Sequence, residues 1–183
     1  MNIDNICRYL GVKIPTDDLI KKIEYVISEA KKTIKPAIIY STCSISKIEN
    51  GIALDNTDLI LIGNLAKTYF DGCKNTIIVA ATLTLSSEIF IKRMFSKSSE
   101  YGTIADAVLT EMVEDVLDSF EENLNNNGKK FKSRISCGYG DLDLKYELDL
   151  YNYLNAQSIG ISINNSFMKT PNKSVIALIG ELE

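Results

Sequence analysis

The sequence of 183 residues contains no histidine and only three prolines. Histidine is the commonest metal ligand in proteins and the side chain used most often as a general base near neutral pH. Its absence excludes nucleophilic sites of the Ser-His and Cys-His types, and it excludes zinc sites that depend on imidazole. Histidine-dependent metal or acid–base chemistry is therefore not expected.

Cysteine is also sparse, with four residues scattered along the chain and no Cys-x-x-Cys pair. Such spacing is typical of reduced, mostly buried thiols and not of a disulfide framework or a metal site. The first residues lack a basic region followed by an apolar run, so no signal peptide is expected. No apolar stretch approaches the length of a membrane span. We therefore expect a cytoplasmic protein that does not interact with membranes.

An excess of basic residues is missing as well, because 24 acidic residues outnumber 20 basic ones. Nucleic-acid binders present a basic face to phosphate, so the partners should be proteins or small molecules and not nucleic acid. The length and the 45% of hydrophobic residues predict one domain over residues 1–183. We divide it into an N-terminal helical part with a first strand, 1–45, and a core, 46–183.

The hydrophobic pattern predicts helices and strands in an irregular order. Thr16 is a suitable cap for the first helix, which Pro36 ends, and Asp141 or Asp143 is a suitable cap for the last. Asn50-Gly51 predicts a hairpin turn because both residues tolerate positive φ, and Pro171-Asn172 predicts a turn between the last two strands. The helices are predicted at 17–35, 64–70, 86–95, 103–124 and 144–154, a loop at 96–102, and strands at 37–42, 59–62, 76–85, 161–165 and 174–179.

This order lacks a regular β-α-β alternation. It predicts an α+β domain with a curved, mostly antiparallel or mixed sheet and packed helices, and it argues against a doubly wound fold. The strand at 76–85, the most apolar segment, should lie inside the sheet. The helix at 103–124 is strongly acidic, and its phase places Glu114 at the border of the buried face and Glu111 in solvent. A break in this helix is predicted at 125–128.

The segment Lys132–Asp143 combines an arginine with two glycines and an intervening tyrosine. A guanidinium offers a planar fork of donors to a carboxylate, and glycine lets a ligand approach the backbone. A turn with a solvated arginine would explain the same spacing. The pattern alone leaves both interpretations open. Cys137 in this segment is not expected to act as a nucleophile, because no proton acceptor can be assigned to it.

The run Arg134-x-Ser136-x-Gly138-Tyr139-Gly140-Asp141, followed by Ser166-Phe167-Met168-x-x-Pro171-x-x-Ser174-Val175, resembles the activation (reactivation) domain of cobalamin-dependent methionine synthase, in its free-standing bacterial form. Two upstream pieces extend this resemblance over most of the chain: Cys7-Arg8-Tyr9-Leu10-Gly11 and Ala80-Ala81-Thr82-Leu83.

The resemblance implies that the chain binds S-adenosylmethionine and presents it to cobalamin held by a methionine synthase or a related corrinoid partner, which is reactivated by reductive methylation with a flavodoxin or ferredoxin-like reductant. Arg134 would bind the methionyl carboxylate, and Ser136 and Gly138 would offer backbone groups. Tyr139 would pack against the ligand, and Glu114 would pair with its ammonium or ribose. The chain would position the reactants without an acid, base or nucleophile of its own, so whether it counts as an enzyme stays open.

The sequence also departs from the family pattern. Family members usually have proline at Cys137, an aromatic residue at Leu142, glycine at Thr84 and an acidic residue at Asn165. A side chain at Thr84 occupies space where backbone would otherwise come close. An alternative follows: a docking module for a corrinoid methyltransferase that has lost cofactor binding. A methyltransferase with its own substrate is less favoured, because no Gly-rich loop follows an early strand.

Overall fold

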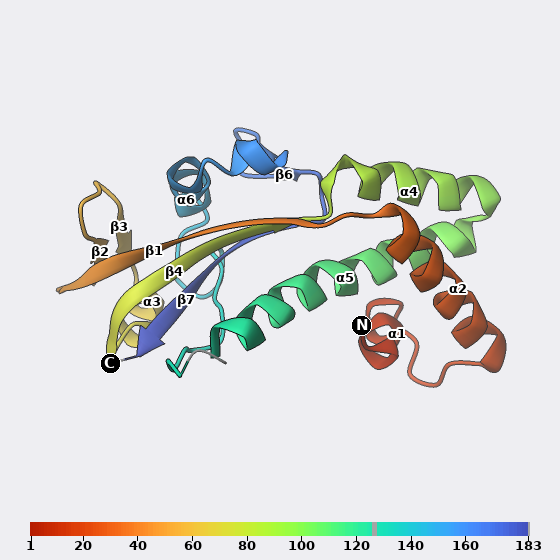
Figure 1. Ribbon diagram of the computed structural model, residues 1–183, viewed down its shortest axis with the longest axis horizontal. Helices are drawn as coiled ribbons and strands as arrows, with labels where there is room; N and C mark the ends of the chain where they lie inside the picture. The colour runs from red at the N-terminus through yellow and green to blue at the C-terminus, as the bar shows by residue number, and fades with distance from the viewer. Residues whose placement is uncertain (126–127, 183) are drawn as a thin grey trace.

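A five-stranded sheet forms one end of the molecule, and helices form the other (Figure 1). The computed structural model describes residues 1–125 and 128–182. The strand order is β3-β2-β1-β4-β7, and every neighbouring pair is antiparallel. The α+β prediction with a curved, mostly antiparallel sheet is confirmed. The strands are β1 (Ala37–Ile48), β2 (Gly51–Leu54), β3 (Ile60–Ile62), β4 (Cys73–Thr82) and β7 (Ser174–Leu182).

Strand β4 lies between β1 and β7, inside the sheet as predicted, although it ends at Thr82. Its side chains alternate between two cores, as the two-residue period of a strand requires. Ile78 and Ala80 pack with helices α3 (Asn64–Tyr69) and α6 (Tyr146–Leu154), whereas Ile77 and Val79 pack with helix α5 (Ser99–Asn125). Helices therefore cover both faces of the sheet.

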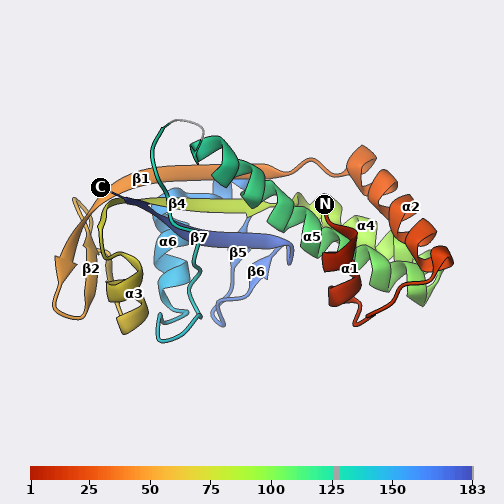
Figure 2. The ribbon, with the colours of Figure 1, turned by 90° about the horizontal axis from the view of Figure 1, so that it is seen from below.

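Helix α5 continues beyond the sheet into the helical end, where it contacts α1 (Ile3–Tyr9), α2 (Asp17–Thr33) and α4 (Thr84–Lys97) (Figure 2). The predicted Thr16 cap is present, since its side chain accepts a hydrogen bond from the backbone N–H of Leu19 at 3.2 Å. The predicted loop at 96–102 was wrong: α4 extends to Lys97 and α5 begins at Ser99. Helix α5 ends at Asn125, and residues 126–127 of the predicted break lie outside the described residues.

The last predicted strand pair was also wrong. Short strands β5 (Ser162–Ile163) and β6 (Lys169–Thr170) pair with each other, and β7 pairs with β4. A short 3-10 helix, η1 (Ala156–Ile159), precedes β5. Local pattern finds a strand but does not choose its partner, because register is set by which face becomes buried. Residues 45 and 46, the predicted division between the two parts of the domain, both lie inside β1.

The hairpin at Asn50-Gly51 forms, but for a different reason from the predicted one. Ile48 is paired with Gly51, so the turn consists of residues 49 and 50. None of the residues 49, 50 and 51 has a positive φ. A Cβ on Gly51 would lie 2.0 Å from the backbone oxygen of Leu61 on β3. Glycine is needed here because the neighbouring strand comes too close for any side chain.

Thr84, at the start of α4, has a φ of 60°, in the left-handed region that disfavours β-branched residues. Its hydroxyl lies 2.8 Å from that of Ser86. We expect Thr84→Gly to stabilise the fold by about 1 kcal/mol, since relief of backbone strain exceeds the lost hydroxyl contact and the extra entropy of an unfolded glycine. Urea unfolding midpoints measure this change.

Asn56 offers a matched control, because its φ is also 60° and asparagine tolerates this conformation. Asn56→Gly should leave the midpoint nearly unchanged. Equal shifts for the two variants would contradict a strained Thr84.

Candidate functional site

The segment 131–135 is held along the free edge of β7. Phe131 forms a bridge with Glu181, and Ile135 exchanges two backbone hydrogen bonds with Leu178, at 2.9 and 2.8 Å. These bonds fix the backbone on both sides of Arg134. The arginine side chain therefore has a defined position against the nearby end of α5.

Asp141 holds the other end of the loop. The sequence predicted it as a cap for the following helix, but its carboxylate accepts the backbone N–H groups of Asn64 and Leu65, at 2.6 and 2.8 Å, at the start of α3. Asp143 is closer to the prediction, because it accepts the N–H of Lys145 at 2.9 Å just before α6. Asp141 thus joins the loop to a helix that lies 76 residues earlier in the chain.

The two hydrogen bonds, first that from Leu65 and then that from Asn64, hold the pKa of the Asp141 carboxyl below its usual value. A lowered pKa in the folded state stabilises the protein above the ordinary aspartate pKa, and this stabilisation is lost as the pH falls through the folded-state pKa. We expect Asp141→Asn to be less stable than the natural protein at pH 7 and to lose less of its stability on acidification to about pH 3. Urea midpoints at the two pH values measure this.

Asp58 is exposed, and Asp58→Asn removes the same charge as Asp141→Asn, so it is the control. Parallel pH curves for Asp141→Asn and the natural protein would show that Asp141 does not couple the loop to α3.

A hollow of about 290 Å³ lies where this loop, α3, α5 and β7 meet. This volume is just below the range typical for small-molecule sites, which begins at about 300 Å³. Four of the five residues predicted for the site line it; Gly138 is not among the lining residues. The lining consists of Leu65, Glu114, Arg134, Ile135, Ser136, Tyr139 and Val175.

Gly138 instead shapes the turn. Its φ of 90° lies in the region that favours glycine, and its N–H donates to the backbone oxygen of Leu142 at 2.8 Å. Tyr139 follows with a side chain that is 68% exposed, so its ring is available at the mouth of the hollow. The turn therefore presents an aromatic face beside the charged groups.

Arg134 is surrounded by acidic side chains from one face of α5. Its guanidinium donates to Glu114 at 2.6 Å, to Asp118 at 2.7 Å and also to Glu121. Burial opposes the charged form, but hydrogen bonds to these three carboxylates raise the pKa of Arg134 above its usual value. The guanidinium therefore stays charged and is already engaged before any ligand enters.

Sequence reasoning missed Asp118 and Glu121 as neighbours of Arg134. They follow Glu114 at four and seven positions, the spacing at which helical side chains share a face. That spacing was the available signal. The spacing could not predict that Arg134 would lie opposite this face of the helix.

The prediction that Glu111 faces solvent was wrong. Its side chain is 5% exposed and accepts hydrogen bonds from the backbone N–H of Asn2 at 2.9 Å and from Nδ2 of Asn5 at 3.2 Å. Helix α1, which the sequence analysis did not predict, covers this side of α5 (Figure 2). A single apolar stripe on α5 could not reveal a second packing partner.

Cys137 is buried, and burial together with nearby Glu147 raises the pKa of its thiol to about 12. A protonated thiol is a poor nucleophile at neutral pH. None of the four cysteines forms a disulfide, and all four are buried. Within residues 1–125 and 128–182, no group of three potential metal-binding side chains lies close enough to hold an ion. In the same residues, no helix has both the length and the apolar character needed to cross a membrane.

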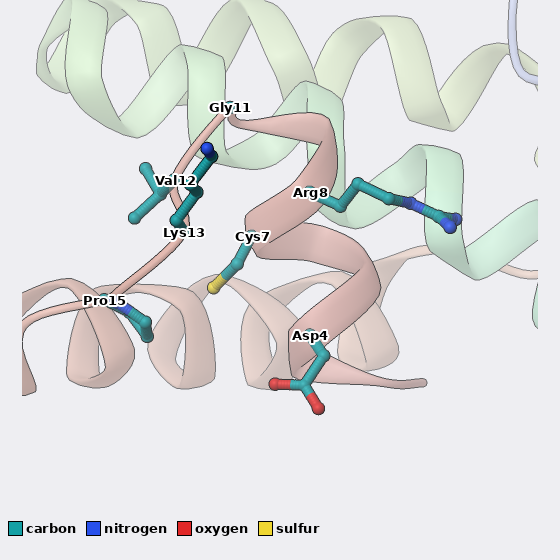
Figure 3. Close-up of a pocket in the computed structure, with 7 residues that line it drawn as sticks. All are labelled: Asp4, Cys7, Arg8, Gly11, Val12, Lys13 and Pro15. Carbon is teal, nitrogen blue, oxygen red and sulfur yellow. The ribbon is translucent and has the colours of Figure 1, made fainter.

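A larger hollow, of about 450 Å³, lies between α1 and the loop that leads to α2 (Figure 3). Its charged side chains diverge: Asp4 and Arg8 extend in different directions from the helix, and Lys13 points away from both. A specific ligand site needs polar groups that converge. The hollow beside Arg134 is therefore the better candidate, although it is smaller.

No family model matches the sequence, and no curated protein matches it. Among solved structures, the chain is similar to the crystal structure of the MetH reactivation domain bound to AdoHcy, with a TM-score of 0.71. The identity is 13%, and the match covers 90% of this chain and 65% of that chain. The chain thus spans about two thirds of the neighbour's length, and the similarity establishes the fold.

Proposed function

We propose that the chain binds S-adenosylmethionine in the hollow beside Arg134 and serves in the reactivation of a cobalamin-dependent methionine synthase or a related corrinoid enzyme. The observation that carries this proposal is the contact between Glu114 and Arg134, at 2.6 Å. Residues selected by the family resemblance come from segments 20 positions apart and line one hollow. The solved neighbour, which has the same fold and holds AdoHcy, supports a ligand of this class.

The charged side chains match the carboxylate and the ammonium of the ligand's amino-acid part. Arg134 would take the carboxylate through a charge-assisted, two-pronged pair, and Glu114 would take the ammonium or the ribose hydroxyls. The backbone at Ser136 would bind the ligand's polar edge, and Gly138 would hold the turn that brings this backbone close. The exposed ring of Tyr139 would cover an apolar part of the ligand.

In the proposed reaction, S-adenosylmethionine held by this chain would supply a methyl cation to cobalamin on the partner and leave as S-adenosylhomocysteine, while a flavodoxin or ferredoxin-like donor would supply one electron. The chain would contribute by orienting the methyl donor and excluding water, since positioning alone lowers a barrier substantially. The four buried cysteines, none of which forms a disulfide, support a reducing compartment such as the cytoplasm.

A second function is favoured by one specific observation: Arg134 already has three carboxylate partners, so a ligand must displace some of them. A docking module that keeps the partner surface without binding the cofactor would tolerate such pairing. The side chain of Thr84, at a position where glycine is usual in the resembled family, agrees with this alternative.

Calorimetric titration separates the two. We expect saturable binding of S-adenosylmethionine at one site per chain, either alone or with a cobalamin-loaded methionine synthase fragment present. Absence of binding in both settings, together with capture of the cobalamin-binding fragment without ligand, would instead establish the docking module.

A further inference from the structure

The first part of β1 forms an open edge of the sheet. Strand β1 pairs with β4 through residues 37–44, but it pairs with β2 only through residues 45–48. On the β2 side, residues 37–44 therefore have no neighbouring strand. This edge lies on the opposite side of β4 from β7 (Figure 2).

The direction of the backbone groups along this edge follows from one hydrogen bond. The C=O of Ser44 accepts the N–H of Asp55, which follows β2, at 2.9 Å. In an antiparallel strand, the N–H and C=O of one residue point to the same side, and successive residues alternate. The N–H and C=O groups of Ile38, Tyr40 and Thr42 therefore point to the β2 side as well. Among the residues that the structure describes, none forms a hydrogen bond with them there.

The other edges of the sheet are covered or short. Segment 131–135 lies along β7 and pairs with it. Strand β3 has only three residues, and the N–H of Ile62 donates to the hydroxyl of Tyr146 at 3.2 Å. The edge of β1 is thus the longest uncovered edge in the described part of the sheet.

The open edge of β1 also lacks the usual protection against pairing. Natural edge strands carry charged residues, proline or a bulge, which prevent association with another strand. Residues 38–44 contain no charged residue and no proline, and their pairing with β4 has no bulge. Two of the outward residues are apolar and accessible, since Ile38 is 38% exposed and Tyr40 is 55% exposed. The edge is therefore a suitable template for a further strand.

We propose that this edge pairs with the same edge of a second copy of the chain, in antiparallel order about a two-fold axis at Tyr40. The two five-stranded sheets would then form one continuous sheet. Ile38 of one copy would lie opposite Thr42 of the other, and all three outward residues would use both backbone groups. A two-fold axis brings a surface against itself, and like charges directly opposite each other destabilise a strand pair. An uncharged segment meets this condition.

Charges that flank the edge are complementary in this arrangement. Pro36 of the second copy would lie at the level of Ser44 and end the pairing, because proline has no N–H to donate. Lys35, which is exposed and precedes that proline, would then approach Asp55 of the first copy. The carboxylate of Asp55 is held in place by the hydroxyl of Ser46 at 2.7 Å. The two-fold axis makes the same contact twice, which favours a second copy of this chain as the partner.

The dimer should be weak, because a strand pair of a few residues covers less than the roughly 1,200–2,000 Å² of a standard stable interface. Its formation should therefore depend on protein concentration. The hollow beside Arg134 lies at the β7 edge, so it would stay open in both copies. The proposal goes beyond the proposed function and does not depend on any ligand.

The test is sedimentation equilibrium of the full chain without ligand, over a range of concentrations. The natural protein should approach twice the mass of one chain as the concentration rises. Thr42→Pro removes an N–H that has no partner within the described chain, and proline is tolerated on the open side of an edge strand. The fold should persist, while the dissociation constant of the dimer should rise at least about tenfold, because two hydrogen bonds are lost.

Thr42→Val is the matched control, because it keeps the N–H and a strong preference for strands. It should keep the natural dissociation constant. Hydrogen exchange locates the contact: the N–H groups of Ile38 and Tyr40 should exchange slowly in the dimer and fast in Thr42→Pro. A second pair of variants guards against unfolding by proline. Ile38→Lys should separate the copies, whereas Ile60→Lys, at a residue on β3 that is 46% exposed, should not.

A natural protein that is monomeric at every concentration overturns the proposal. So does a dimer that both Thr42→Pro and Ile38→Lys leave unchanged, because the contact would then lie elsewhere. Slow exchange of these N–H groups in a monomer would mean that another segment covers the edge, and it would also overturn pairing between two copies.

Discussion

Replacement of Arg134 by alanine is expected to weaken S-adenosylmethionine binding by about 1.5–3 kcal/mol, the range for a hydrogen bond to a charged group. The backbone that carries the guanidinium is fixed by the pairing of segment 131–135 with β7. Among the described residues that line the hollow, no other cation can replace it. Titration calorimetry measures the change. An unchanged affinity would show that the ligand binds elsewhere.

The same substitution should lower stability, because it leaves three carboxylates facing one another. A second variant separates the two effects. Arg134→Ala combined with Glu121→Gln removes the most buried of these carboxylates and should recover much of the lost stability. It should not recover ligand binding. Arg134→Lys keeps the charge without the planar fork and should bind with intermediate affinity.

Replacement of Leu117 by alanine should destabilise the protein by about 3–4 kcal/mol, a large fraction of the stability of a typical domain. Leu117 is fully buried where α5 rests on the sheet. It packs with the odd-numbered side chains of β4 and β7: Ile77, Val79, Ala81, Ala177 and Ile179. Removing its side chain opens a cavity that the flanking strands, held by their backbone hydrogen bonds, can fill only in part.

Urea unfolding measures this loss, and Leu117→Met, which nearly conserves volume, should cost less than about 1.5 kcal/mol. Leu117 lies between Glu114 and Asp118 on α5, so loosening of the helix should also weaken ligand binding. A small stability change for the alanine variant would mean that α5 is held mainly at its helical end.

Features that depend only on neighbours along the chain could be predicted from the order of residues. The cap at Thr16, the short helix α3 and the interior strand β4 follow from local residue preferences and from the period of the apolar residues. Helix phase placed Glu114 correctly at the border of the buried face, beside Arg134, but it wrongly placed Glu111 in solvent. Whether these residues bind S-adenosylmethionine stays a prediction.

Features that depend on distant segments emerged only when the whole chain was packed. The burial of Glu111 required α1, the role of Asp141 required a helix 76 residues away, and the need for Gly51 required β3. The pairing of Arg134 with Asp118 and Glu121 likewise required that the edge of β7 lie beside α5. A periodic pattern reports that a face is buried, but not against which element. Partner choice is settled only when the whole core packs together, because burial energy depends on total contact and not on position in the chain.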